Sequence, residues 1–324
     1  MRKGGNEHLR KAKKNKNDEF YTQLVDIESE LKNYEDQFQN KIVYCNSDDP
    51  TISNFYKYFA INFESLGLKK LIASCYVDDE LSLFSCDQKR LSGYYYEYTG
   101  GKDEVIIPTL EDVTYFKGNG DFRSVESIEL LKQADVVVTN PPFSLFRDHI
   151  AQIIEYEKEF LVIGNINAIT YKEIFKLIKA NKAWMGIKMG RGISGFIVPD
   201  HYELYGTETS IDKLGNNIIS PNNCLWLTNL DNSQRHTDIS LTKTYKGNEE
   251  EYLNYDNYDG INVNKTKDIP VDYKGTMGVP ITFLHKFNPD QFEIIKFRKG
   301  NDNRDLSING KTPYFRILIR NKRI

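Results

Sequence analysis

Short apolar runs alternate with helical patterns along the first 180 residues of the chain. Runs of β-branched and aromatic residues predict buried strands over residues 41–45, 70–77, 135–139 and 159–164. Apolar residues at helical spacing predict helices over residues 27–38, 53–66, 125–133, 143–156 and 171–180. Strands and helices that alternate in this way form βαβ units around a mostly parallel sheet with both faces covered. The pattern therefore predicts an α/β fold.

The other segments give weaker patterns. Residues 80–112 contain two short runs, at 94–96 and 105–107, that fit either strands or an inserted segment. After Trp184 glycines interrupt the pattern, and residues 222–227 predict one more strand. From about residue 233 onward Asn, Asp, Lys and Tyr dominate without regular alternation. We therefore place a domain boundary near residue 232.

The charge of the chain is unevenly distributed. The net charge of −3 alone argues against a nucleic-acid-binding protein. The first 16 residues, however, carry one acid and seven basic residues: Arg2, Lys3, Arg10, Lys11, Lys13, Lys14 and Lys16. The last stretch carries basic residues and no acid: Lys311, Arg316, Arg320, Lys322 and Arg323. Basic ends fit phosphate contacts, which need a local patch, and they fit solvated tails equally well.

The cysteine pattern and the amino terminus restrict the class of protein. The four cysteines form no CxxC pair and lack the spacing of a zinc site, so we expect neither a metal site nor a disulfide framework. No stretch approaches the ~20 consecutive apolar residues that a membrane span requires. The basic amino terminus precedes no apolar segment, unlike a secretory signal. We therefore expect a cytoplasmic protein that contacts no membrane.

The predicted strand 135–139 runs directly into Asn140, Pro141, Pro142 and Phe143. In open α/β sheets ligands bind at the carboxyl ends of the strands, where the strand order reverses. Two prolines fix the backbone and withhold their N–H donors, which leaves carbonyl oxygens, one amide and an aromatic face. That set of groups suits a planar heterocycle with an amino group. A stiff strand-to-helix turn without any such role is the alternative interpretation.

Methylation of the exocyclic N6 of adenine fits these groups. The N6 lone pair is delocalised into the ring, so it is a poor nucleophile. The side-chain oxygen of Asn140 and the carbonyl of Pro141 can each accept an N6 hydrogen bond, and Phe143 can stack on the base, a contact worth ~1–3 kcal/mol. The transfer is then a direct displacement in which positioning contributes most of the rate. A base inside a duplex must be flipped out to reach such a site.

Longer segments resemble a known family. KNKNDEFYTQ at residues 14–23, VYCNSDDP and SNFYKYFAINF within 41–63, LGLKKLIASCYV, VVVTNPPFSLF and MGVPITFLHKFNPDQFEII are similar to the EcoRI-type adenine-specific DNA methyltransferases. The resemblance covers essentially the whole chain. It implies a Rossmann-like S-adenosylmethionine-dependent methyltransferase sheet with a C-terminal target-recognition region. Asn46 to Pro50 stand where other methyltransferases have the glycine-rich FxGxG loop.

The resemblance also implies roles for single residues. Tyr21 and Thr22 would lie near the methionine part of S-adenosylmethionine, and Asp48 or Asp49 near its amino acid end. Asp78 would bind the ribose hydroxyls, and Asp121 and Phe122 would bracket the adenine of the cofactor. Asp48, Asp49 and Asp78 could equally be exposed acids at loop ends, whereas this alternative fits Asp121 less well. Cofactor motifs that precede the catalytic motif, with the recognition region last, match the γ arrangement.

The implied organisation has three parts. Residues 1–16 form a flexible basic arm, 17–232 a catalytic domain and 233–324 a DNA target-recognition region. Candidates for phosphate contacts or guanine readout in the last part are Arg298, Lys299, Arg304, Arg316 and Arg320. Tyr252, Tyr255 and Tyr258 could stack on bases, but loop packing is the favoured interpretation for all of them.

The leading hypothesis is a site-specific DNA adenine-N6 methyltransferase that protects host DNA in a restriction–modification system. Its partner is double-stranded DNA, it acts as a monomer, and a cognate restriction endonuclease is not expected to bind it stably. The same N-P-P-aromatic loop serves methyltransferases of RNA adenine and of protein glutamine. A catalytically silent DNA-binding protein is the third alternative.

Overall fold

The computed structural model describes residues 21–77, 92–101, 107–199, 209–220, 222–298, 306–313 and 315–324. The chain folds into two compact units. Unit 1 comprises Met1–Ala168 and Lys188–Leu230, and unit 2 comprises Ile169–Ile187 and Asp231–Ile324. Among the residues singled out in the sequence, the basic arm 1–16, Asp78, Lys299 and Arg304 lie outside the described residues.

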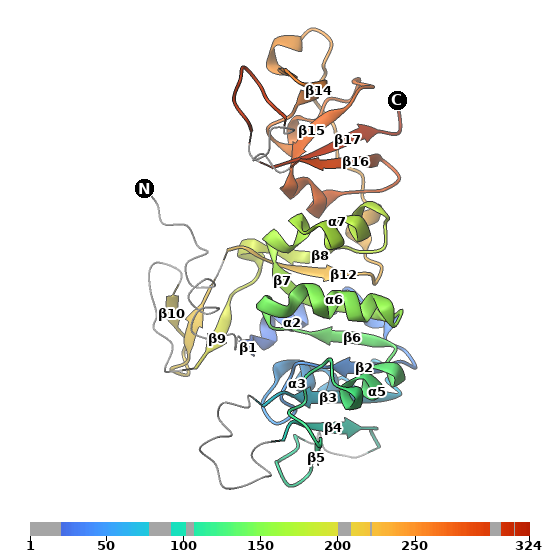
Figure 1. The fold of residues 1–324 in the computed structure, drawn as a ribbon, viewed down its shortest axis with the longest axis vertical. Helices are drawn as coiled ribbons and strands as arrows, with labels where there is room; N and C mark the ends of the chain where they lie inside the picture. The colour runs from blue at the N-terminus through green and yellow to red at the C-terminus, as the bar shows by residue number, and fades with distance from the viewer. Residues whose placement is uncertain are drawn as a thin grey trace. The chain divides into compact units, whose positions relative to one another are not determined.

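A large mixed sheet has most of its strands in unit 1 (Figure 1). Its order is β5-β4-β3-β2-β6-β7-β12-β8. The strands are β2 (Ile42–Cys45), β3 (Lys70–Cys75), β4 (Tyr94–Tyr98), β5 (Thr114–Tyr115), β6 (Val136–Thr139), β7 (Glu159–Asn165), β8 (Trp184–Met189) and β12 (Cys224–Thr228). The central strands β3, β2, β6 and β7 are parallel, whereas β4, β5 and β12 are antiparallel to their neighbours. The parallel sheet that the sequence predicts is therefore present at the centre, with antiparallel flanks.

The helices of unit 1 begin at capping residues that the sequence supplies. They are α2 (Leu24–Leu31), α3 (Asn54–Ile61), α5 (Val125–Gln133) and α6 (Phe146–Glu155). Ser53 caps α3 by accepting from the backbone N–H groups of Phe55 and Tyr56, and Ser124 caps α5 by accepting from the N–H of Ser127. The predicted helix at 143–156 starts as a 3-10 turn, η3 (Phe143–Leu145), and becomes α-helical at Phe146.

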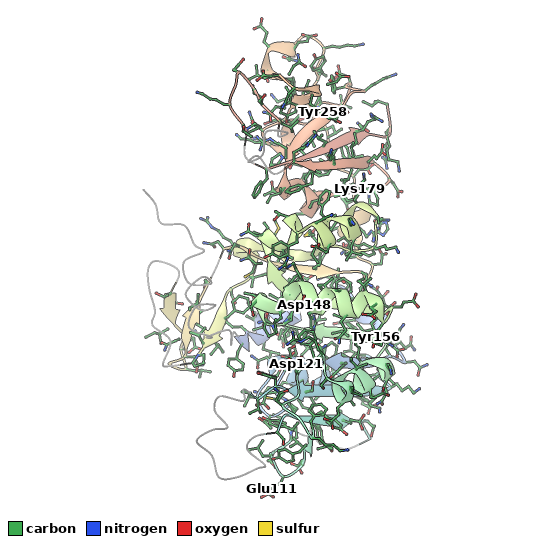
Figure 2. The ribbon with its side chains drawn as sticks, in the orientation of Figure 1. Glu111, Asp121, Asp148, Tyr156, Lys179 and Tyr258 are labelled. Atoms are coloured by element: carbon green, nitrogen blue, oxygen red, sulfur yellow. The ribbon has the colours of Figure 1, made fainter. Side chains whose placement is uncertain are left out.

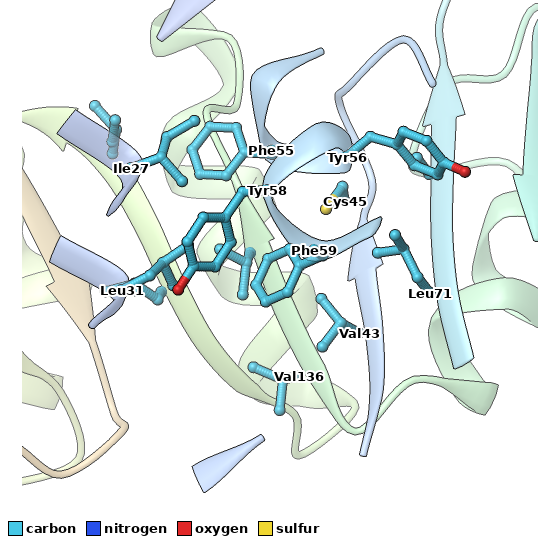
Figure 3. Packing of buried hydrophobic residues seen from close by; sticks show 14 of the residues in the cluster. Ile27, Leu31, Val43, Cys45, Phe55, Tyr56, Tyr58, Phe59, Leu71 and Val136 are labelled. Atoms are coloured by element: carbon cyan, nitrogen blue, oxygen red, sulfur yellow. The ribbon is translucent and has the colours of Figure 1, made fainter. Parts of the chain in front are cut away.

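Apolar residues of α2 and α3 cover one face of the sheet (Figure 3). Phe55, Phe59 and Ile27 are buried against alternate strand residues such as Val43 and Val136. Successive strand residues point to opposite faces, so Tyr44 and Val137, also fully buried, face the other side. On that side α6 packs closely, because a Cβ on Gly164 of β7 would lie 2.5 Å from Phe146. The sheet of unit 1 is thus covered on both faces.

A second, four-stranded antiparallel sheet in unit 1 has the order β1-β9-β11-β10. Its strands are β1 (Tyr21–Thr22), β9 (Phe196–Val198), β10 (Thr209–Ile211) and β11 (Asn217–Ile219). The predicted interruption by glycines after Trp184 is therefore a segment of short strands. Asp26 of α2 accepts hydrogen bonds from the backbone N–H and the hydroxyl of Ser194, at 2.9 and 2.7 Å from Oδ1 and Oδ2. These bonds fix the chain just before β9.

Unit 2 contains α7 (Lys172–Lys179) and a five-stranded sheet of order β13-β14-β15-β17-β16. The strands are β13 (Asn254–Tyr255), β14 (Tyr258–Asn262), β15 (Met277–Pro280), β16 (Phe292–Arg298) and β17 (Arg316–Asn321). The ring of Phe175 on α7 lies 5.1 Å from that of Phe297, and Lys179 (Figure 2) donates to the carbonyl of Ile295 at 2.6 Å. The segment 169–187 therefore packs with the C-terminal residues, although the sequence pattern assigned it to the preceding βαβ series.

Short 3-10 turns complete the described chain: η1 (Glu35–Gln37), η4 (Ile166–Thr170), η5 (Gly190–Gly192), η6 (Ser233–His236), η7 (Glu249–Glu251), η8 (Thr266–Asp268) and η9 (Ile281–Lys286). No helix in the described part of the chain has the length and apolar character needed to cross a membrane.

Candidate active site

The loops after β2 and β6 leave the same edge of the large sheet, because these two strands are parallel neighbours. The first loop carries Asp48 and Asp49, and the second begins at Asn140. The strand after β2 in the chain, β3, lies on one side of it, and β6 lies on the other. The strand order thus reverses at β2, which is where open α/β sheets bind their ligands.

A hydrogen bond joins the two loops. The hydroxyl of Thr139, the last residue of β6, lies 2.5 Å from Oδ2 of Asp48. Oδ1 of Asp48 accepts from the hydroxyl of Ser53, the cap of α3, at 2.7 Å. Burial raises the pKa of Asp48 to about 6, while the bonds from Thr139 and Ser53 act in the opposite direction. This carboxylate is held firmly at the centre of the edge.

The neighbouring acid, Asp49, is occupied by local contacts. Its Oδ1 accepts from the backbone and hydroxyl of Thr51, at 2.8 and 2.7 Å. Its Oδ2 accepts from the hydroxyl of Tyr94 on β4 at 2.8 Å. Asp49 therefore ties the first loop to β4, a structural role that the sequence did not indicate.

The catalytic candidates follow β6 without a break. Asn140 is partly buried, and Pro142 has φ −52° and ψ 124°, so its carbonyl can accept from the N–H of Leu145 at 3.0 Å. The ring of Phe143 packs edge-on against that of Phe196, with 6.2 Å between centroids and 81° between planes. Phe196 lies on β9 and is fully buried. A residue 53 positions later in the chain thus fixes the orientation of Phe143.

Tyr21 and Thr22 reach the same edge through β1. Thr22 pairs with Phe196 in the antiparallel register, and its carbonyl accepts from the side-chain amide of Asn54 at 2.9 Å. Asn54 is the first residue of α3, beside the loop that carries Asp48. The hydroxyl of Thr22 is buried and makes no hydrogen bond within the described residues. A buried hydroxyl in this state is suited to a polar group of a ligand.

Asp121 and Phe122 lie on the loop that follows β5. The loop passes the end of β3, since the N–H of Val77 donates to the carbonyl of Asn119 at 2.9 Å. The carboxylate of Asp121 (Figure 2) accepts two hydrogen bonds from the Arg123 guanidinium, at 2.9 and 2.6 Å. These bonds hold the pKa of Asp121 below its usual value. Phe122 is buried beside α6.

The structure therefore brings Thr22, Asp48, Asn140, Phe143 and Phe122 to one edge of the sheet. The carboxylates of Asp48, Asp49 and Asp121 each accept hydrogen bonds from other side chains. Sequence reasoning missed Thr139, Tyr94, Phe196 and His149, which act through contacts between distant segments. Thr139 and His149 have one signal in the sequence, proximity to the motif, because Thr139 precedes Asn140 and His149 follows Phe143 by six positions. Tyr94 and Phe196 have no such signal. Within the described ranges no group of three or more His, Cys, Asp or Glu side chains could hold a metal ion.

The basic candidates of unit 2 that the structure describes lie on two adjacent strands. Arg298 ends β16, and Arg316 and Arg320 lie on β17. Arg316 donates to the side-chain oxygen of Asn262 at 2.9 Å. Tyr252 and Tyr255 are buried, which confirms packing as their role, and Tyr258 is partly exposed (Figure 2).

Comparison with known proteins identifies the family. The family model "Adenine-specific methyltransferase EcoRI" matches residues 8–322. The chain is 64% identical over 323 residues to the Type II methyltransferase M.EcoRI of Escherichia coli, with 100% of this chain and 99% of the relative covered. It is 39% identical to M.MgeORF184P of Mycoplasma genitalium and 36% identical to M.MpnI of Mycoplasma pneumoniae, each over at least 97% of this chain.

No solved structure matches the chain. The family match and the full-length similarity confirm the resemblance inferred from the sequence motifs. They are consistent with an enzyme that modifies DNA and uses a methyl donor. The chain is an adenine-specific DNA methyltransferase and belongs to the EcoRI adenine-specific methyltransferase family.

Proposed function

We propose that this protein transfers a methyl group from S-adenosylmethionine to the N6 of an adenine flipped out of double-stranded DNA. One observation carries the proposal. The loop that bears Asp48 and the loop that begins at Asn140 meet at the point where the strand order reverses, and the Thr139–Asp48 hydrogen bond joins them. Cofactor and base therefore meet between the two loops.

The residues at this edge fit S-adenosylmethionine. Asp48 is a carboxylate suited to the ammonium group at the amino acid end of the cofactor. The buried hydroxyl of Thr22 can bond a polar group of the methionine part. Phe122 supplies an aromatic surface for the adenine of the cofactor. Asp121 would accept from the adenine amino group, and Tyr21 and Asp49 support the surrounding loops. When bound, S-adenosylmethionine supplies an electrophilic methyl group on a sulfonium.

The catalytic motif positions the base. Asn140 and the carbonyl of Pro141 accept hydrogen bonds from N6, which turns the nitrogen lone pair toward the methyl group. Pro142 keeps the loop rigid, and Phe143 stacks on the flipped adenine. The N6–carbon bond forms as the carbon–sulfur bond breaks, and N6 then releases one proton to water. This displacement needs no cysteine nucleophile, and of the described cysteines Cys45 and Cys224 are buried in the core.

The proposal extends to the organisation of the protein. Residues 17–232 form a Rossmann-like catalytic domain, 233–324 form the DNA target-recognition region, and 1–16 are a basic arm. Support comes from the parallel core β3-β2-β6-β7 and from the separate compact sheet of unit 2. The enzyme acts as a monomer in the cytoplasm and protects host DNA without a stable complex with its restriction endonuclease.

The decisive experiment is methyl transfer from labelled S-adenosylmethionine to unmethylated bacterial DNA, followed by nucleoside analysis. We expect label in N6-methyladenine alone. DNA that already carries the modification is the control and should accept no label at the same sites. Label in cytosine would overturn the proposed acceptor atom. Label in RNA or protein with DNA inert would overturn the proposed substrate.

A further inference from the structure

Two polar side chains of α6 are buried although the mechanism does not use them. His149 is 0% exposed and Gln152 is 9% exposed. They are three positions apart, so they lie on one side of the helix. The helix begins directly after the catalytic motif, at Phe146. Buried polar side chains are retained where they form specific hydrogen bonds, so their partners are informative.

His149 bonds the first residue of the β2 loop. Its Nε2 lies 2.9 Å from Oδ1 of Asn46, which is itself 4% exposed. An amide oxygen can only accept, so Nε2 carries the proton. Burial lowers the pKa of His149 to about 3, which keeps the ring neutral. A neutral donor of fixed tautomer therefore sets the start of the loop that leads to Asp48.

The same helix also holds Phe122. The edge of the His149 ring contacts the Phe122 ring, with 5.2 Å between centroids and 69° between planes. The side-chain amide of Gln152 donates to the carbonyl of Phe122 at 3.0 Å. His149 thus contacts the ring of Phe122, and Gln152 holds its backbone carbonyl.

We propose that His149 and Gln152 are positioning residues that hold two parts of the cofactor site, the loop that leads from Asn46 to Asp48 and the loop that carries Phe122, against the helix that follows the catalytic motif. The inference rests on the proposed use of S-adenosylmethionine. Neither side chain touches a substrate in this scheme. Their role is to fix the positions of Asn46 and Phe122 relative to Asn140. Binding of the cofactor therefore depends on α6.

The test is equilibrium binding of S-adenosylmethionine by calorimetry, with no DNA present. His149→Leu removes the donor to Asn46 and the ring edge, and Gln152→Met removes the donor to Phe122. We expect each to raise the Kd for S-adenosylmethionine about tenfold or more. His149→Gln keeps a donor near the position of Nε2, so it should recover part of the affinity. Glu155→Gln, on the exposed side of α6, is the matched control and should bind as the wild type does.

Steady-state kinetics separate positioning from a general structural defect. The KM for S-adenosylmethionine should rise more than kcat falls, and the KM for DNA should stay near the wild-type value. Unfolding in urea without ligand measures the stability of each variant; if His149→Leu fails to fold, Gln152→Met decides. Wild-type affinity in Gln152→Met, and in His149→Leu where it folds, would overturn the positioning role. A wild-type protein that binds no S-adenosylmethionine would instead overturn the cofactor assignment.

Discussion

The hydroxyl of Thr139 and the carboxylate of Asp48 lie 2.5 Å apart, across 91 positions of the chain. Thr139 is fully buried at the end of β6, one residue before Asn140. Asp48 belongs to the loop after β2, and its second oxygen accepts from Ser53. A single carboxylate thus links the proposed cofactor loop, the cap of α3 and the strand that presents the catalytic asparagine.

The raised pKa of Asp48 predicts a pH-dependent stability. Its pKa of about 6 in the folded protein lies above the ordinary value of 3.8, so the unfolded chain releases this proton more readily. The contribution of Asp48 to folding is therefore fully present at low pH and is lost as the pH rises through 6. Between about pH 5 and about pH 7.5 the wild type should lose on the order of 1 kcal/mol of unfolding free energy relative to Asp48→Asn.

Urea unfolding of both proteins across this pH range measures the difference. Only the difference between the profiles is informative, because other groups titrate in both proteins. Parallel profiles would show that the carboxyl of Asp48 is not perturbed.

Asn140→Ala should abolish methyl transfer while S-adenosylmethionine still binds. The variant loses an acceptor that orients N6 in the transition state, and loss of one such bond lowers kcat by roughly 10²–10³-fold. Single-turnover methylation and calorimetric binding of the cofactor measure the two effects separately. Asn140→Asp keeps an acceptor oxygen at the same place and should retain more activity than Asn140→Ala. Full activity in the alanine variant would contradict the proposed mechanism.

The contact between Phe143 and Phe196 predicts a remote effect on base stacking. Phe196→Leu removes the ring edge that fixes Phe143, so the flipped adenine should stack less well. Phe143→Ala removes the stacking surface altogether, and the loss of ~1–3 kcal/mol corresponds to roughly 5-fold to 150-fold weaker retention of the flipped base. Fluorescence of 2-aminopurine at the target position reports flipping directly.

Phe38→Leu is the control for loss of a buried ring, because Phe38 is fully buried and packs against Phe59. It should lower stability and leave the fluorescence signal unchanged. If Phe196→Leu behaves in the same way, Phe196 is a core residue without influence on the site.

Gly120 gives a prediction for the adenine side of the cofactor site. Its φ is +81°, and a Cβ at this position would lie 2.5 Å from the carbonyl of Cys75. Gly120→Ala must therefore shift the loop that carries Asp121 and Phe122. We expect weaker binding of S-adenosylmethionine and lower thermal stability. Gly118→Ala is the control, since nothing lies within 4 Å of a Cβ there. Equal cofactor affinity in both variants would contradict a role of this loop in binding.

The sequence predicted the parallel core because its strands are short, apolar and bounded by turns. The predicted strand 135–139 corresponds to β6 (Val136–Thr139), and the helix predicted at 125–133 is α5 (Val125–Gln133). The strands β16 and β17 were missed. They pair with each other across a long connection, and a polar composition surrounds them, so no local alternation identifies them.

In the site, too, contiguous residues could be predicted from the sequence, whereas contacts between distant residues could not. The motif at Asn140 is contiguous, so it could be identified in the sequence together with the acids after β2. The Thr139–Asp48 bond and the His149–Asn46 bond span 91 and 103 positions, and only the folded chain brings these residues together. The two hydrogen bonds that Arg123 donates to the carboxylate of Asp121 also could not be read from the motif alone. Local pattern therefore identifies a motif, and contacts between distant segments supply the partners that hold it in place.

Arg320 tests the proposed recognition region. It lies on β17, and its guanidinium is 3.9 Å from the carboxylate of Glu293, with both side chains more than half exposed. If Arg320 contacts a DNA phosphate, Arg320→Ala should weaken binding to all sequences and reduce the slope of log K against log salt by about 1. Affinity for S-adenosylmethionine should not change.

Glu293→Gln separates a phosphate contact from a simple ion pair. Removal of the acid leaves Arg320 free to bind phosphate, so DNA affinity should rise or stay equal and the salt slope should persist. A surface ion pair that matters only within the protein would make both variants behave alike. Filter binding at several salt concentrations measures the slopes. A wild-type slope in Arg320→Ala would place the DNA contact elsewhere in the chain.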